Sequence, residues 1–171
     1  MSIDHGVLAA LLDRQAIEDT LYGYAARIDM RDHEGVRVLL TDDVVAEYGN
    51  NGSLQGADEV IRYIHEFTED AVWEHHLINV YEVSIDGDTA TALIYHTSHQ
   101  MFGSAPGVVH KIVGRYHDEL RRTPDGWKIS RLMLEILWAD RATDATGYLD
   151  LINGTGPRMP QDRHRMPSPA V

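Results

Sequence analysis

The hydrophobic pattern of the chain changes its period near residue 72. Before that point apolar residues recur every three or four positions, which is the spacing of an amphipathic helix. We predict helices at about residues 4–28, 32–40 and 57–68, and a strand at residues 44–48. Beyond residue 72 apolar and polar residues alternate, which is typical of strands. We predict four long strands at residues 76–85, 89–102, 108–122 and 127–138, separated by Gly-containing turns.

Helices followed by a run of antiparallel strands indicate an α+β domain, with the helices packed on one face of a curved sheet. Such a sheet can enclose a pocket for a ligand. The 171 residues suit one domain spanning 1–171, and we expect an irregular tail from about residue 154.

The chain contains no cysteine. Disulfides, thiolate nucleophiles and cysteine zinc sites are therefore excluded, and a reducing compartment is favoured. We read no signal peptide at the N-terminus and no apolar run long enough to span a bilayer, so we expect a cytoplasmic protein.

Acidic residues outnumber basic ones by 27 to 15, which gives a formal net charge of −12. Nucleic acids and anionic membranes attract basic surfaces, so both are poor candidate partners. We expect instead a small apolar or aromatic molecule.

Asp29 stands at the edge of an apolar helical stripe that includes Tyr24 and Ile28. A carboxylate in that position must be paired, hydrogen-bonded or used in chemistry. One interpretation is a helix-end residue bound to backbone amides or to a neighbouring arginine. The other is half of an acid–base pair with one of the ten histidines of the chain.

Several histidines fall on the predicted strands. His75 and His76 are adjacent, so they point to opposite faces and at most one of them can face a pocket. His96 and His99 are three residues apart and also face opposite sides of a regular strand. No compact motif such as His-x-x-x-His is present, so we predict neither a metal site nor a cofactor.

The order of elements, with the turns Asp-Gly-Asp-Thr-Ala and Asp-Gly-Trp-Lys-Ile, resembles the SnoaL-like branch of the NTF2-like superfamily over about residues 8–140. This resemblance implies a cone in which a curved mixed or antiparallel sheet wraps around a pocket closed by three N-terminal helices. Residues 24–29, 47–48, 74–79 and 95–100 are similar to active-site segments of the scytalone dehydratase-like branch. The resemblance implies catalytic roles for Asp29, His75, Tyr48 and His99.

Within those segments, Ile28 stands where scytalone dehydratase has a second tyrosine, so the resemblance supports the acid–base pair better than the substrate contacts. The residues expected to contact substrate are Tyr24, Ile28, His76, His110, Arg131 and Trp138.

We therefore predict a cofactor-independent lyase of the dehydratase type, or an isomerase, acting on a small apolar cyclic substrate. His75 would be the general base and acid, because a histidine has a reference pKa of about 6.5 that suits proton transfer near neutral pH. Asp29 would orient its ring. Two alternatives stay open: a non-catalytic binding or assembly module, and a polyketide cyclase or metal-dependent, oxygenase-associated subunit.

The resemblance also implies a homo-oligomer, a trimer or a dimer, that assembles through the outer face of the sheet. The candidates for apolar outward residues are Val80, Val109, Ile112 and Leu134.

Overall fold

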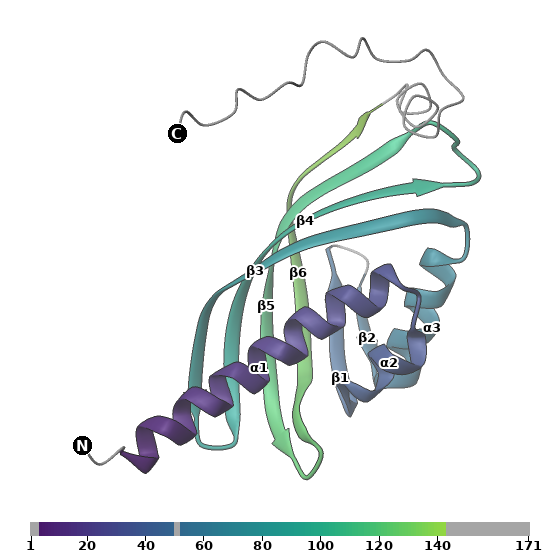
Figure 1. Ribbon diagram of the computed structural model, residues 1–171. Coiled ribbons are helices and arrows are strands. Elements are labelled where there is room, and N and C mark those ends of the chain that lie inside the picture. The colour runs from purple at the N-terminus through teal and green to yellow at the C-terminus, as the bar shows by residue number, and fades with distance from the viewer. Residues whose placement is uncertain (1–3, 50–51, 143–171) are drawn as a thin grey trace, which may run out of the picture.

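The computed structural model describes residues 4–49 and 52–142, and it has the expected α+β architecture (Figure 1). The long helix α1 (His5–Asp29) runs across one face of a six-stranded sheet, and α2 (His33–Val38) and α3 (Ala57–Thr68) lie together at one end of it. The strands are β1 (Leu40–Tyr48), β2 (Ser53–Gln55), β3 (Ala71–Asp86), β4 (Thr89–Phe102), β5 (Val109–Thr123) and β6 (Gly126–Ala142). The tail predicted from residue 154 lies outside the described residues.

The sheet is mixed and has the strand order β2-β1-β6-β5-β4-β3. Strands β3 to β6 form three consecutive antiparallel pairs, whereas β1 joins the edge of β6 in parallel. The short strand β2, which we did not predict, pairs antiparallel with β1. The buried residues of the three helices pack against the concave side of this sheet, where they form one hydrophobic core.

Helix α1 ends at Asp29 because the chain turns sharply at Arg31. Arg31 has a φ of 54°, in the left-handed region that ends many helices. The backbone N–H groups of Arg31 and Asp32 donate to the carbonyls of Ile28 and Arg27, each at 2.9 Å. This turn places Asp29 beside the first half of β3.

Strand β3 contains one extra residue in the middle of its pairing with β4. Glu82 pairs with Leu93, whereas Val80 pairs with Ile94, so Tyr81 has no partner of its own. Along the chain, the side chains of β3 that point toward the helices therefore change from even-numbered to odd-numbered positions at this bulge. Strand β4 pairs with β5 without any such shift.

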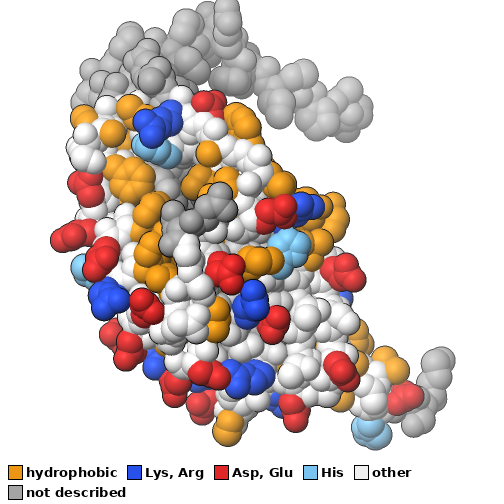
Figure 2. Space-filling view, turned by 180° about the vertical axis from the view of Figure 1, so that it is seen from behind, with side chains coloured by type: hydrophobic (Ala, Val, Ile, Leu, Met, Phe, Trp, Pro, Cys, Tyr) orange, Lys and Arg blue, Asp and Glu red, His pale blue; other side chains and the backbone are white. Residues whose placement is uncertain are grey.

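On the face seen in Figure 2, Lys and Arg side chains are interspersed with Asp and Glu, and hydrophobic side chains gather toward the top of the view. Within the described ranges, no helix is both long and apolar enough to cross a membrane.

Candidate active site

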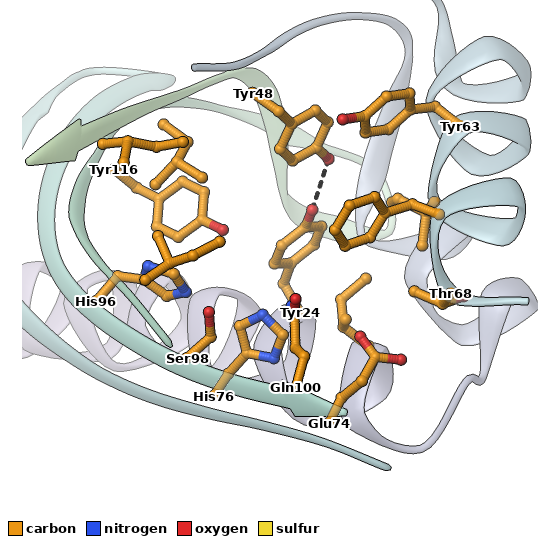
Figure 3. A pocket seen from close by; sticks show the side chains of 16 residues that line it. Tyr24, Tyr48, Tyr63, Thr68, Glu74, His76, His96, Ser98, Gln100 and Tyr116 are labelled. Carbon is orange, nitrogen blue, oxygen red and sulfur yellow. Dashed lines mark hydrogen bonds between the residues drawn. The ribbon is translucent and has the colours of Figure 1, made fainter. Parts of the chain in front are cut away.

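A cavity of about 140 Å³ lies between the concave face of the sheet and the helices (Figure 3). One side of it is aromatic and apolar, with side chains from α1, α3, β1 and β6. The other side is polar, with side chains from β3 and β4. The polar residues of that side are Glu74, His76, His96, Ser98 and Gln100.

Asp29 holds His76 by two hydrogen bonds. Its Oδ1 lies 2.6 Å from Nδ1 of the imidazole, and its Oδ2 accepts a bond of 2.9 Å from the backbone N–H of the same residue. Burial acts to raise the pKa of Asp29, but the hydrogen bonds from His76 outweigh it and the pKa is lowered. An ionised carboxylate only accepts, so the imidazole proton lies on Nδ1 and leaves Nε2 free to take a proton.

His76 lines the cavity, whereas Asp29 does not. The carboxylate therefore lies behind the imidazole and fixes its tautomer and orientation, while the ring itself faces the space where a ligand would bind. The side chain of His76 is 10% exposed.

The expected pairing of Asp29 with His75 is wrong. His75 is exposed on the outer face of the sheet, beside His99, with 6.3 Å between the two ring centroids. The bulge at Tyr81 is the physical reason, because it shifts the inward side chains of β3 by one position. The expected place of His99 in the site is wrong as well, and the inward histidine of β4 is His96.

Three further residues expected to contact substrate do not line the cavity. His110 lies near the end of β5, with its ring against Phe102. Arg131 donates to Glu47 at 3.2 Å, and Trp138 is 48% exposed on β6. Their positions follow from the strand register, which the sequence pattern did not define.

The structure does place Tyr24, Ile28 and Tyr48 at the cavity, as expected. The hydroxyls of Tyr24 and Tyr48 lie 2.7 Å apart, and the ring of Tyr48 stacks on Tyr63 at 5.1 Å between centroids. Burial raises the pKa of both bonded tyrosines, so both hydroxyls keep their protons at neutral pH. They can donate hydrogen bonds to a substrate.

Sequence reasoning did not assign the polar residues of β4. His96, Ser98 and Gln100 alternate along β4 and all face the cavity, and Ser98 pairs with His76 in the sheet. Burial, together with a smaller contribution from the neighbouring His76, lowers the pKa of His96 to about 4, so His96 is neutral at pH 7. Neither ring nitrogen of His96 nor the hydroxyl of Ser98 has a hydrogen-bond partner among the described residues. The even-numbered alternation from Ala90 to Gln100 was the signal that could have found them.

Glu74 lies on the same face of β3 as His76, and its side chain is 1% exposed. Burial raises its pKa, although the charges of His76 and Arg31 act in the opposite direction. Nε of Arg31 lies 3.9 Å from its Oε1. The carboxyl of Glu74 is thus a further titratable group at the cavity.

In the part of the chain that the structure describes, no group of three or more His, Asp or Glu side chains converges in a way that could hold a metal ion.

Comparison with known protein families matches residues 9–133 to the SnoaL-like domain. The chain belongs to the SnoaL-like domain family. This SnoaL-like protein is 26% identical to the uncharacterized protein Rv2910c of Mycobacterium tuberculosis over 125 residues. The aligned residues are 72% of this chain and 85% of the relative.

Two solved structures from Novosphingobium aromaticivorans are similar to the SnoaL-like protein. A proposed aromatic ring hydroxylase is 25% identical with a TM-score of 0.72, covering 77% of this chain and 94% of the other. A proposed scytalone dehydratase is 18% identical with a TM-score of 0.72, and the match covers 81% of this chain and 95% of the other. A hexachlorocyclohexane dehydrochlorinase from Novosphingobium barchaimii is 16% identical with a TM-score of 0.72, and the match covers 79% of this chain and 93% of the other. At these identities the last two likenesses show the fold, whose relatives include dehydratases and dehydrochlorinases.

Proposed function

We propose that the protein is a cofactor-independent lyase or isomerase that transfers protons within a small cyclic substrate. The observation that carries this proposal is the hydrogen bond between Asp29 and His76, with His76 facing the cavity. His76 takes the role of general base and acid that was predicted for His75.

The reaction needs two proton transfers. Nε2 of His76 removes a proton from a carbon of the substrate, and the electron pair of the broken C–H bond forms a double bond. In an elimination the leaving group departs from the neighbouring carbon with the electron pair of its bond. A hydroxyl takes the proton of the imidazolium and leaves as water, whereas chloride leaves as the anion and the imidazolium passes its proton to water. In an isomerisation the electron pair of an adjacent double bond moves to another carbon, which takes the proton back from the imidazolium. Asp29 stabilises the imidazolium between the two transfers.

The size of the cavity supports a substrate with one ring. An apolar cavity of roughly 150 Å³ in a protein core can hold benzene, and this cavity measures about 140 Å³. The hydroxyls of Tyr24 and Tyr48 are available to a polar substituent, and the neutral His96 offers one donor and one acceptor.

The contact between Asp29 and His76 favours catalysis over a module that only binds ligands, since a binding module needs no carboxylate behind a histidine. A solvated Asp29 that points away from every histidine would have favoured binding alone. An oxygenase-associated, metal-dependent role is tested by metal analysis of the purified protein.

The proposal is tested with two eliminations of one-ring compounds. The first is the loss of water from 3-hydroxycyclohexanone, which is measured by the ultraviolet absorbance of the enone product. The second is the loss of chloride from hexachlorocyclohexane. We expect His76→Ala and Asp29→Asn each to lower the rate by at least about a hundredfold, because each removes part of the general base.

The matched control is His75→Ala, which removes the neighbouring, outward histidine and should leave the rate unchanged. Circular dichroism would verify that all three variants are folded. Full activity in folded His76→Ala protein would overturn the proposal, and so would a loss in His75→Ala equal to that in His76→Ala.

A further inference from the structure

Asp118 is a carboxyl group that the proposed reaction does not use. It lies on β5, is 4% exposed, and accepts a hydrogen bond from the backbone N–H of Met133. Its other oxygen, Oδ1, is fully buried and has no hydrogen-bond partner among the described residues. A buried polar atom without a partner costs free energy, so this atom is expected to meet a group that the protein itself does not supply.

A second, smaller pocket of about 20 Å³, called the lobe below, lies beside Asp118. Tyr24, His76 and Tyr116 line both this lobe and the main cavity, so the two spaces share walls. A water molecule needs roughly 10–15 Å³ measured in this way. The lobe is therefore large enough for one oxygen atom and too small for a ring.

The surroundings of Asp118 keep its carboxyl group neutral. Burial raises its pKa well above the usual range, and no Lys or Arg side chain lines the lobe to favour the charged form. A carboxylic acid that stays protonated at neutral pH can donate a hydrogen bond through its O–H group.

We propose that this lobe is an oxygen subsite, in which the O–H of Asp118 donates a hydrogen bond to the carbonyl oxygen of the substrate. The inference rests on the proposed function and narrows its substrate class to cyclic carbonyl compounds. The proton that His76 removes is then on the carbon next to the carbonyl, because His76 and Asp118 line the same lobe.

The electrons balance without any further reactant. When Nε2 of His76 takes the proton, the C–H electron pair forms a C=C bond and the carbonyl π pair moves onto the oxygen. The resulting enolate oxygen accepts the hydrogen bond from Asp118, which stabilises its negative charge. The enolate then re-forms the carbonyl and expels a hydroxyl from the next carbon, and this hydroxyl leaves as water with the proton of the imidazolium.

Two tyrosines add to the polarity of the subsite. If the hydroxyl of Tyr48 donates to that of Tyr24, the proton of Tyr24 is free for a ligand. The hydroxyl of Tyr116 is directed into the cavity (Figure 3). Burial raises the pKa of Tyr116 well above its usual value, so it also remains a donor.

The test uses 4-nitrophenol, a one-ring probe whose ionised form is yellow and carries its charge on an oxygen. We expect the bound phenol to ionise at a lower pH than the free phenol, because the subsite favours an oxyanion. In Asp118→Leu, which keeps the approximate size and removes the donor, affinity for the ionised form should fall at least about tenfold. Asp118→Asn retains an N–H donor and should lose less.

Two further variants separate this inference from the proposed function. Glu119→Gln alters the neighbouring, outward carboxyl of β5 and should leave binding unchanged. Asp29→Asn disables the proposed base and should keep the effect of Asp118 on the bound phenol. The binding measurement can therefore support the oxygen subsite even if the protein shows no catalysis. Equally, catalysis can be confirmed while the binding measurement contradicts the oxygen subsite.

A second measurement reads the proton on Asp118 directly. The infrared difference spectrum between the natural protein and Asp118→Asn at pH 7 should contain the carbonyl stretch of a neutral carboxylic acid. Carboxylate bands in its place would overturn the inference. Equal affinity of the natural protein and Asp118→Leu for the ionised phenol would also overturn it, since the lobe would then hold only a structural water.

Discussion

At the scale of single residues, His96 is a buried histidine that the fold keeps uncharged. An unfolded histidine has a pKa of about 6.5, whereas that of folded His96 is lowered to about 4. The unfolded chain therefore binds more protons between these two values, and stability is lost as the pH falls from 6.5 to 4. The loss attributable to His96 is on the order of 3 kcal/mol.

Urea unfolding at pH 7 and pH 4.5 measures this loss, and His96→Phe should reduce it because phenylalanine cannot take a proton. His99→Phe is the matched comparison on the outer face of β4. Burial also lowers the pKa of His99, but His99 is less buried than His96, so this change should reduce the pH dependence by less than His96→Phe does. An unchanged pH dependence in His96→Phe would contradict the prediction.

The hydroxyl pair of Tyr24 and Tyr48 permits a double-mutant cycle. Each single Tyr→Phe change leaves the other buried hydroxyl without this partner, at a cost of about 1–3 kcal/mol. The double variant should cost less than the sum of the single variants, since no hydroxyl of the pair then remains unpartnered. The free energy of unfolding in urea measures all four proteins, and strict additivity would mean that the two hydroxyls do not interact.

The sequence identified Asp29 as a special residue but not its partner. A carboxylate at the edge of an apolar stripe is visible in the sequence, because the helical period is regular from Ile17 to Ile28. The side of β3 that a histidine faces depends on the bulge at Tyr81, and no turn residue marks it. One extra residue exchanges the roles of His75 and His76. The sequence therefore limited the partner of Asp29 to these two histidines, and the prediction of His75 was wrong.

At the scale of secondary-structure elements, Gly114 allows β5 and β6 to lie close together. A Cβ atom at this position would lie 2.5 Å from the carbonyl oxygen of Glu135, next to the point where the pairing of the two strands shifts register. We expect Gly114→Ala to lower the free energy of unfolding by about 1–3 kcal/mol through this overlap. The overlap outweighs the gain of about 0.4–1 kcal/mol that a Gly→Ala change brings by restricting the unfolded chain.

Urea unfolding checks this prediction, with Thr91→Ala as a control at an exposed position of β4. A Gly114→Ala protein more stable than the natural one would show that the strands adjust without cost.

Most elements were predictable because their patterns are local. The helix over 57–68 and the strand over 89–102 have the predicted bounds, since alternation and Gly-containing turns define them. The short β2 and the parallel pairing of β1 with β6 were not predicted. Three residues are too few for a period to show, and a contact between distant segments leaves no spacing signal in one sequence.

At the scale of the whole molecule, the outer face of the sheet carries exposed hydrophobic side chains. Leu77 and Tyr81 are each 65% exposed, and the ring of Tyr81 lies 4.5 Å from that of Tyr95 between centroids. Of the candidates named from sequence, Val80, Ile112 and Leu134 belong instead to the core or the cavity. We propose that the protein forms a dimer or trimer through the face that bears Leu77 and Tyr81.

Sedimentation velocity tests this assembly. The natural protein should sediment faster than a monomer, and the double change Leu77→Glu with Tyr81→Glu should yield monomers, because it places charge in an apolar contact. Ser84→Glu adds a charge at an exposed position of the same strand and should leave the assembly intact. A monomeric natural protein would contradict the proposal.

Asp29 binds both the ring and the backbone N–H of His76, across a separation of 47 residues. The end of α1 therefore forms these two hydrogen bonds with only one register of β3. A slip of β3 by one residue would place His75 beside Asp29 instead. Refolded protein could contain helices, strands and a compact core and still carry that slip. If the proposed reaction is confirmed, the recovery of turnover after denaturation would count the molecules whose strands have paired correctly, which circular dichroism cannot do.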